Sequence, residues 1–211
     1  MAANLMLKRG DIISEYSEEP NVIIVQQNNC TAVYVNPASF AGKLAVALPY
    51  SNPYCERSPG NYRNLAKIEC RPSLGSITLK RHDNHHPIVC CFFAQYKMGS
   101  PNFDYYRNAN DLDSDYLNIS DTVDDRLQHF ETCLLKLLNE IETNDSIRHV
   151  EKIIFPYEIG CNRGGGNWDD YLNKIKTFAS MLYNINSNMG VEIVKFNNVV
   201  KFDNVKKRRY G

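Results

Sequence analysis

The strongest constraint on the fold is a glycine-rich loop that lies between a strand-like run and an amphipathic helix. The run covers residues 150–155, four glycines fall within 160–166, and apolar residues then recur at helical spacing from Trp168 to Tyr183. A strand, a loop and a helix in this order are typical of a layered α/β domain with parallel strands. Such domains bind ligands at the carboxyl ends of their strands. We therefore expect this loop to lie at a ligand site.

Other apolar, β-branched runs along the chain predict the remaining strands of the sheet. The predicted strands lie at residues 22–25, 77–79, 88–94, 150–155 and 191–196. The run 88–94 shows no alternation, which is typical of a strand buried on both faces. A second long helix is expected from Asp125, with an apolar stripe from Leu127 to Ile141. Thr122 and Asp125 can form a capping box ahead of it.

Composition narrows the class of protein. The chain has 211 residues, and 24 Lys and Arg balance 24 Asp and Glu. The zero net charge argues against a general nucleic-acid binder, which would carry a basic excess. No run approaches the ~18 apolar residues of a membrane span. The length suits one domain, which we expect over residues 1–198, with a polar surface loop at 102–121 and a basic tail at 199–211.

The seven cysteines are odd in number, and the first ten residues contain no apolar signal-peptide core. Free thiols in a reducing compartment are the better interpretation, and we expect a cytoplasmic protein. The run Lys206–Arg209 is consistent with a nuclear signal, although a solvated tail is the simpler reading.

The glycine-rich loop has the chemistry of an anion site. Glycines let the backbone approach a ligand with its amide N–H groups outward, and a helix N-terminus adds a partial positive charge. Phosphate is the anion that we expect there. The segment matches neither a P-loop, which needs a lysine after the glycines, nor the dinucleotide fingerprint. The alternative is a tight turn that binds nothing.

A second polar segment follows the predicted strand at 22–25. Asn28 and Asn29 end that strand, and a helix is expected to start near Lys43, just after Ala41 and Gly42. Carboxamides can hydrogen-bond sugar hydroxyls, and a helix start can receive phosphate. Polar residues at a strand end are more often caps or turns, so this segment alone is a weak signal.

Two further candidates are weaker. His82, His85 and His86 form the only histidine cluster, but an exposed turn explains them better than a metal site, and we predict no metal or cofactor. Cys161 lies near a helix N-terminus, which can lower a thiol pKa. No base is evident beside it, so a nucleophilic role is not expected.

Taken together, the two segments resemble those of a macro domain, the ADP-ribose-binding α/β module. The likeness extends over about residues 5–196 and is closest to the branch of ADP-ribose 1″-phosphate phosphatases and phage-type macro proteins. It is carried by Gly10-Asp11-Ile12, by Val25-Gln26-Gln27-Asn28-Asn29-Cys30 with the loop to Ala45, by Phe93-Ala94-Gln95, and by Tyr157-Glu158-Ile159-Gly160-Cys161 through Gly164-Gly165-Gly166-Asn167-Trp168. The resemblance implies a three-layer α/β/α fold with a central mixed, mostly parallel sheet.

The resemblance also implies roles for individual residues. Asp11 would accept the adenine amino group beside Ile12, and Asn29 would contact the distal ribose near the reacting carbon. Ala41 and Gly42 would wrap the diphosphate, and Trp168 would pack under the second phosphate loop. The full set of implied ligand-binding residues is Asp11, Ile12, Gln27, Asn28, Phe40, Ala41, Gly42, Gln95, Tyr157, Gly160, Cys161, Asn162, Arg163, Gly164, Gly165, Gly166 and Asn167, with Asn29 as the catalytic candidate.

The chain departs from the family pattern in informative ways. Branches that act through a covalent lysine carry it near Gln95, with an aspartate near Gly164, and this chain has neither at the matching positions. The first loop has one clear glycine instead of two, with residues 35–38 resembling an insertion. The expected function is binding of ADP-ribose or an ADP-ribosylated substrate, with hydrolysis of its terminal phosphate or distal-ribose linkage. The alternatives are a non-catalytic reader that sequesters a related nucleotide, and a scaffold with a degenerate pocket.

Overall fold

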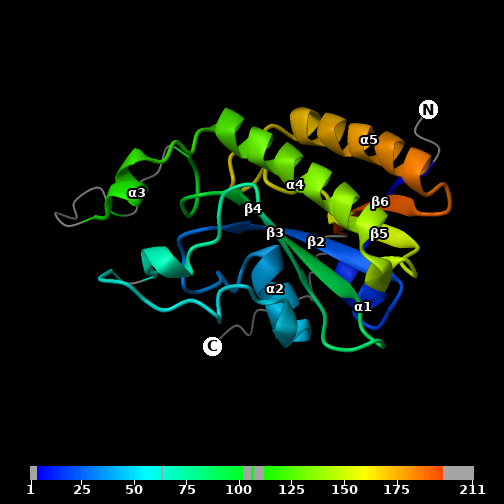
Figure 1. Cartoon of the computed structure of the whole chain (residues 1–211), viewed down its shortest axis with the longest axis horizontal. Coiled ribbons are helices and arrows are strands. Elements are labelled where there is room, and N and C mark those ends of the chain that lie inside the picture. The colour runs from blue at the N-terminus through cyan, green and yellow to red at the C-terminus, as the bar shows by residue number, and fades with distance from the viewer. Residues whose placement is uncertain (1–3, 63, 102–105, 107–111, 197–211) are drawn as a thin grey trace, which may run out of the picture.

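A six-stranded sheet forms the middle layer of the computed structural model, which describes residues 4–62, 64–101, 106 and 112–196 (Figure 1). The strands are β1 (Leu5–Gly10), β2 (Val22–Asn29), β3 (Ile77–Lys80), β4 (Ile88–Gln95), β5 (Lys152–Pro156) and β6 (Gly190–Phe196). Their order is β1-β6-β5-β2-β4-β3. Every neighbouring pair is parallel except β3 and β4. The expected mixed, mostly parallel sheet is therefore confirmed.

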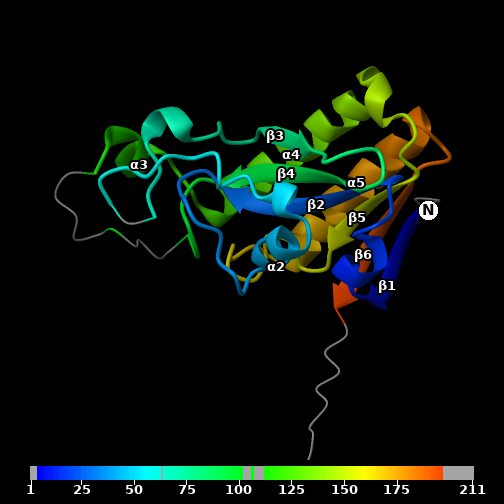
Figure 2. The same cartoon turned by 90° about the horizontal axis from the view of Figure 1, so that it is seen from below.

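Helices cover both faces of this sheet. They are α1 (Ile12–Tyr16), α2 (Phe40–Ala47), α3 (Ser114–Asn118), α4 (Val123–Thr143) and α5 (Trp168–Ile185). Figures 1 and 2 show α4 and α5 side by side on one face, with α1 and α2 on the other. Three short 3-10 turns lie at Pro49–Ser51, Ile68–Cys70 and Asp145–Ile147. The three-layer α/β/α architecture is thus as expected from the sequence.

The central strands are buried because each of their faces meets a different helical layer. In β2, Ile23 and Val25 point into the core beneath α4 and α5, whereas Ile24 belongs to the core beneath α1 and α2. In β4, Phe92 and Phe93 divide in the same way. The absence of alternation in these strands therefore reflects burial on both sides.

Local signals place the long helices well. α4 begins two residues before the predicted start at Asp125, and the Thr122–Asp125 capping box is present. α5 begins at Trp168 as expected, because the Asn167 side chain caps it by accepting a hydrogen bond from the Asp169 amide. α2 begins at Phe40 instead of Lys43, because Ser39 caps it by accepting from the Gly42 amide.

The predicted surface loop at 102–121 is wrong for part of its length. Residues 102–105 and 107–111 lie outside the described part of the chain, but α3 occupies Ser114–Asn118. Asp113 caps α3 and pairs with Arg71, with 2.7 Å between Oδ2 and Nη2, and Tyr116 of α3 is buried. Asp121 is buried as well, so solvation does not explain its charge. The tail at 199–211 also lies outside the described residues.

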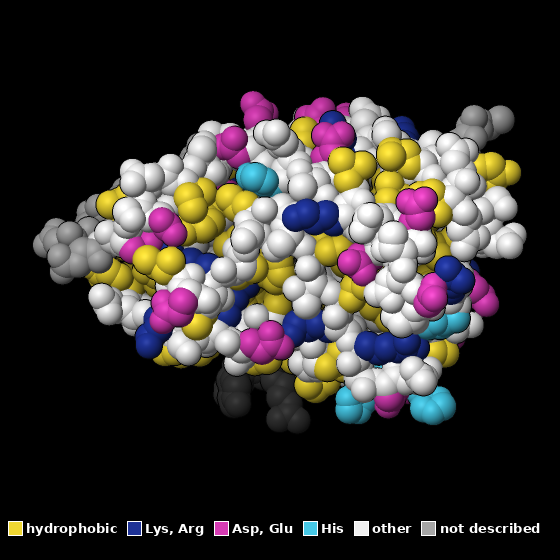
Figure 3. Space-filling model, viewed as in Figure 1, with side chains coloured by type: hydrophobic (Ala, Val, Ile, Leu, Met, Phe, Trp, Pro, Cys, Tyr) yellow, Lys and Arg dark blue, Asp and Glu magenta, His cyan; other side chains and the backbone are white. Residues whose placement is uncertain are grey.

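The surface carries both signs of charge. Acidic and basic side chains are interspersed over the face seen in Figure 3. None of the described helices combines the length and the apolar content needed to cross a bilayer. Within residues 4–62, 64–101, 106 and 112–196, no group of three or more His, Cys, Asp or Glu side chains is placed to hold a metal ion. His86 instead pairs with Asp83, with 2.7 Å between Nδ1 and Oδ1.

Candidate functional site

The main cavity of the described chain lies at the carboxyl ends of β2, β4 and β5 and has a volume of about 840 Å³. Gln27 and Asn29 of β2 and Gln95 of β4 line it. Two loops supply most of the remaining wall, one at residues 34–41 before and into α2 and one at 157–164 before α5. Because neighbouring parallel strands end at the same edge of the sheet, segments far apart in sequence meet there.

The loop between β5 and α5, which we call the second loop (residues 157–166), needs its glycines for steric reasons. Gly160 and Gly165 have φ angles of +76° and +75°, in the region that favours glycine. A Cβ on Gly160 would lie 2.4 Å from a Tyr171 ring carbon, and one on Gly164 would lie 2.2 Å from the Gly160 carbonyl oxygen. A Cβ on Gly166 would meet the Tyr171 ring at 2.5 Å. The backbone therefore folds tightly over the start of α5.

This fold leaves backbone donors available at the cavity. The Gly166 amide donates to the Gly160 carbonyl, and the Cys161 amide donates to that of Glu158. The amides of Gly160, Asn162 and Arg163 donate to no acceptor among the described residues. All three residues line the cavity. Unpaired amide donors beside a helix N-terminus form a suitable site for an anionic group.

The first loop (residues 34–42) forms the opposite wall and is closed by its own polar groups. The Ser39 hydroxyl donates to the Asn36 carbonyl over 2.6 Å. Gly42 is buried against this turn, where a Cβ would lie 2.1 Å from the Asn36 carbonyl oxygen. The single glycine of this loop is thus a packing requirement, and Gly42 does not line the cavity, whereas Phe40 and Ala41 do.

Asn29 is held in one orientation at the edge of the cavity. Its Oδ1 accepts from the Ala32 amide over 2.7 Å, and its Nδ2 donates to the Tyr54 hydroxyl over 3.2 Å. The Asn29 backbone amide donates to the same hydroxyl. Burial raises the pKa of Tyr54, so the hydroxyl stays neutral at any physiological pH. One Nδ2 hydrogen of Asn29 remains for a ligand.

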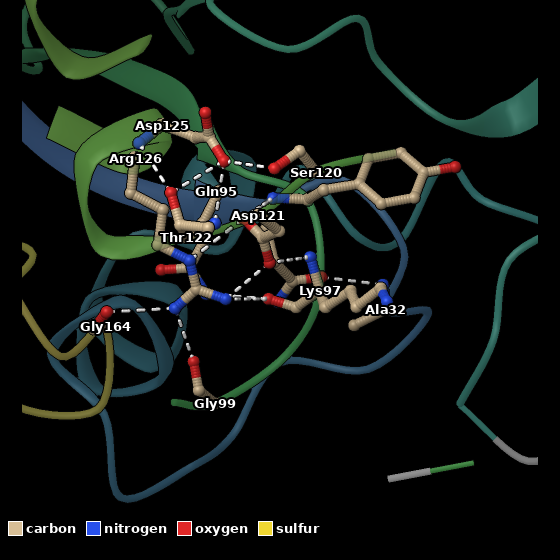
Figure 4. Close-up of polar contacts among 12 residues, drawn as sticks. Ala32, Gln95, Lys97, Gly99, Ser120, Asp121, Thr122, Asp125, Arg126 and Gly164 are labelled. Atoms are coloured by element: carbon tan, nitrogen blue, oxygen red, sulfur yellow. Dashed lines mark hydrogen bonds and ion pairs between the residues drawn. The ribbon is translucent and has the colours of Figure 1, made fainter. Parts of the chain in front are cut away.

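A buried ion pair fixes the second loop to the rest of the site (Figure 4). Arg126 of α4 is fully buried and pairs with Asp121 through both Nε and Nη2. Its Nη1 donates to the Gly164 carbonyl over 2.9 Å and to the Gly99 carbonyl over 2.6 Å. Asp121 in turn accepts from the amides of Tyr96 and Lys97. One guanidinium thereby ties the end of β4 to the second loop.

The structure brings ten of the eighteen predicted site residues to the cavity. Those that line it are Gln27, Asn29, Phe40, Ala41, Gln95, Tyr157, Gly160, Asn162, Arg163 and Gly164. Those that do not are Asp11, Ile12, Asn28, Gly42, Cys161, Gly165, Gly166 and Asn167.

The residues outside the lining have structural partners. Asp11 caps α1 by accepting from the Ile13 amide, and Ile12 is buried beneath α1. Asn28 is buried and donates to the Tyr54 hydroxyl. Trp168 packs on Tyr157, with 4.8 Å between the ring centres, which matches its expected place under the second loop. Contact of Asp11 with an adenine ring stays a prediction.

Sequence reasoning missed several residues of the site. Tyr34, Tyr54, Asn64 and Glu158 line the cavity, and Arg126 positions the second loop. Arg126 had one sequence signal, since it precedes Phe130 by four residues and so falls in line with the apolar stripe of the predicted helix. Tyr54 had none, because it lies in an irregular segment that only the tertiary fold brings beside Asn29.

The expected lowering of the Cys161 pKa is wrong. Burial, with Glu158 and Asp170 nearby, raises the pKa of the Cys161 thiol to about 12. The side chain packs against the core beneath α4 and α5, away from the cavity. All seven cysteines are free, as expected.

Proteins with a similar fold are found among solved structures. No family model matches the sequence, and no curated protein matches it. Among solved structures, the chain is similar to the Trypanosoma brucei macrodomain in complex with ADP-ribose, with a TM-score of 0.51 and 10% identity over 92% of this chain and 64% of that one. It is also similar to the Oceanobacillus iheyensis macrodomain with ADP (TM-score 0.46, 14% identity, 94% and 87% covered). A third similar structure is the alphavirus P23pro-zbd (TM-score 0.49, 11% identity, 90% and 21% covered).

The likeness to the trypanosome structure identifies the fold as the macrodomain α/β fold, in agreement with the sheet order and flanking helices. This chain spans less than two thirds of the trypanosome chain and about a fifth of the alphavirus chain. At these identities the likeness concerns the fold, and the site must be argued from its own residues.

Replacing Arg126 with Met should destabilise the protein by about 3 kcal/mol or more, because Asp121 would stay buried without its partner. Urea unfolding measures this change. Arg148→Met is the matched control, because Arg148 pairs with Asp145 on an exposed turn and such pairs contribute little. Equal effects of the two substitutions would contradict the role assigned to the buried pair.

Cys161 should react slowly with iodoacetamide near neutral pH. Because its pKa is raised, its thiolate fraction should grow about tenfold per pH unit until the pH nears 12. Mass-spectrometric alkylation rates at several pH values test this. A rate that levels off close to neutral pH would show a lowered pKa instead.

Proposed function

We propose that this protein binds ADP-ribose or a close derivative in the main cavity and hydrolyses its terminal phosphate or its distal-ribose linkage. The observation that carries the proposal is the second loop, where Gly160, Asn162 and Arg163 line the cavity and their amides donate to no described acceptor. The same sheet edge presents the Asn29 carboxamide. An anion site beside a sugar-binding carboxamide suits a nucleotide sugar diphosphate.

The cavity suits a ligand of this size. Its volume of about 840 Å³ lies within the ~300–1,000 Å³ range of small-molecule sites. The diphosphate would lie against the second loop, where the amides and the start of α5 supply positive potential without a cluster of basic side chains. The neutral composition of the chain is therefore compatible with an anionic ligand. The fold-level likeness to a macrodomain solved with ADP-ribose adds support by analogy.

Hydrolysis requires an activated water close to the distal ribose. Asn29 would orient that ribose through its remaining Nδ2 hydrogen, while the second loop would stabilise developing negative charge. Glu158 is the one carboxylate among the lining residues that the structure describes. We assign the activation of water to Glu158 or to the phosphate of the substrate itself.

A non-catalytic reader is the second candidate, because the described residues that line the cavity include no lysine. Lys97 follows Gln95 by two positions, but its ammonium lies over the Tyr116 ring, 4.7 Å from the ring centre. A covalent lysine mechanism is therefore not proposed. We do propose that the protein belongs to the phosphatase branch. The free thiols also suggest a cytoplasmic location, which we propose as well.

Replacing Asn162 with Asp should weaken ADP-ribose binding by at least about tenfold, because a carboxylate would be added beside the diphosphate. Calorimetric titration of the parent and the variant with ADP-ribose measures the effect. Asn173→Asp, which adds the same charge on the exposed side of α5, is the control and should bind like the parent. The absence of ADP-ribose binding by the parent would refute the proposed function.

Replacing Glu158 with Gln separates an enzyme from a reader. If Glu158 activates water, the variant should lose at least about tenfold in turnover of ADP-ribose 1″-phosphate while its affinity for ADP-ribose does not fall. Product analysis by chromatography and calorimetric titration provide the two readouts. Turnover by neither protein would support the reader, and unchanged turnover would assign the activation to the substrate phosphate.

A further inference from the structure

A second, smaller cavity adjoins the main one. Its volume is about 440 Å³, and Tyr34, Val35 and Tyr54 line both cavities. The Tyr54 side chain thus stands between them, beside Asn29. The remaining residues around the second cavity are Val33, Asn52, Cys55, Arg57 and Pro59. None of these residues is acidic, and Arg57 is the charged one.

Arg57 is buried without a carboxylate partner. Only 7% of the residue is exposed, and its guanidinium lies 4.5 Å from the centre of the Tyr54 ring. Its Nη1 donates to the carbonyls of Cys30 and Ala32, and its Nη2 donates to that of Asn29. Burial lowers the pKa of Arg57, which reflects the cost of taking this charge out of water.

Two other buried arginines show what Arg57 lacks. Arg126 pairs with Asp121, and the Arg71 side chain, 5% exposed, pairs with Asp113. No carboxylate among the described residues lies within ion-pair distance of Arg57, and the neighbouring Glu56 pairs with Lys80 instead. A buried charge without a counter-charge is costly, and three carbonyl groups supply only part of the compensation.

Arg57 also keeps donors for a ligand. Three of its five N–H hydrogens are engaged, whereas Nε and one Nη2 hydrogen donate to no acceptor among the described residues. Nε is not one of the fully enclosed side-chain atoms without a partner, so part of its surface is accessible. Asn52 uses its Oδ1 to accept from the Tyr54 amide, and its Nδ2 donates to no described acceptor. Arg57, with its free guanidinium hydrogens, and Asn52, with its free carboxamide hydrogens, therefore line the same second cavity.

We infer that the cavity around Arg57 binds an oxyanion, a phosphate or a carboxylate, through the free guanidinium donors and the Asn52 carboxamide. Guanidinium groups bind such planar or tetrahedral oxyanions through charge-assisted hydrogen bonds. The Arg57–Asn29 contact places this oxyanion beside the Asn29 end of the main cavity. That the oxyanion belongs to the ligand of the main cavity, as a charged group beyond its sugar, rests on the proposed function.

Nuclear magnetic resonance of the arginine Nε–H groups tests this site in the full chain without ADP-ribose. Titration with inorganic phosphate, or with acetate in a separate arm, should shift the Arg57 Nε–H signal with saturation. The arm that saturates at lower concentration distinguishes phosphate from carboxylate. Arg71 and Arg126 are internal controls, because their Nε–H groups already donate to the Ala66 carbonyl and to Asp121.

The variant Asn52→Asp tests the site while keeping the contacts of Arg57 with the loop at residues 29–32. An Asp side chain can still accept from the Tyr54 amide, but it adds a competing carboxylate to the cavity. The expected result is an affinity for the oxyanion at least about tenfold weaker. Asn173→Asp is again the control and should retain the affinity of the parent.

Two results would overturn this inference. One is an Arg57 signal that neither oxyanion shifts, or that shifts without saturation. The other is an Asn52→Asp variant with unchanged affinity. Phosphate shifts confined to the amides of residues 160–164 would refute the Arg57 site and leave the proposed function intact. If this protein binds phosphate or acetate saturably at Arg57 but does not bind ADP-ribose, the proposed function is refuted and the Arg57 site stands.

Discussion

The buried pair of Arg126 and Asp121 is the interaction on which the geometry of the site depends. Burying a guanidinium is costly, and for Arg126 the carboxylate of Asp121 and the carbonyls of Gly99 and Gly164 offset that cost. Gly99 belongs to the segment after β4, and Gly164 belongs to the second loop. The ion pair therefore does more than compensate its own burial, because it holds two loop segments against α4 (Figure 4).

The glycines of the second loop are required because the loop backbone packs closely against α5. Tyr171 of α5 stands directly beneath Gly160 and Gly166, so only glycine can bring the backbone so close to the helix. The amides of Gly160, Asn162 and Arg163 donate to no acceptor among the described residues, and these three residues line the cavity. The zero net charge of the chain is then no obstacle to an anionic ligand, since backbone dipoles and Arg163 can supply positive potential at the cavity. Arg57 adds a side-chain charge to the same region, beyond Tyr54.

Much of the fold could be predicted from local patterns. The unbroken apolar runs indicated the buried strands, and the Thr122–Asp125 capping box marked the start of α4 within two residues. The segment around α3 was missed, because its polar and acidic composition indicates solvation when read alone. Only the packed structure shows that Asp113 pairs with Arg71 and that Tyr116 is buried. The lowered pKa considered for Cys161 was wrong for the same reason. Its position near a helix N-terminus is visible in the sequence, but its burial is not.

The sequence by itself determined the layered α/β architecture, the position of the glycine-rich loop at a strand end, and the identity of Asn29 as a polar residue at a second strand end. These features depend on periodicity and on residues close together along the chain. The tertiary structure decided which polar groups face a cavity and which are consumed by structural contacts. Asn29 and its neighbour Asn28 have the same side chain and both donate to the Tyr54 hydroxyl, but Asn29 lines the cavity and Asn28 is buried. Tyr54 and Arg57 entered the site only through contacts between distant segments, which no local pattern records.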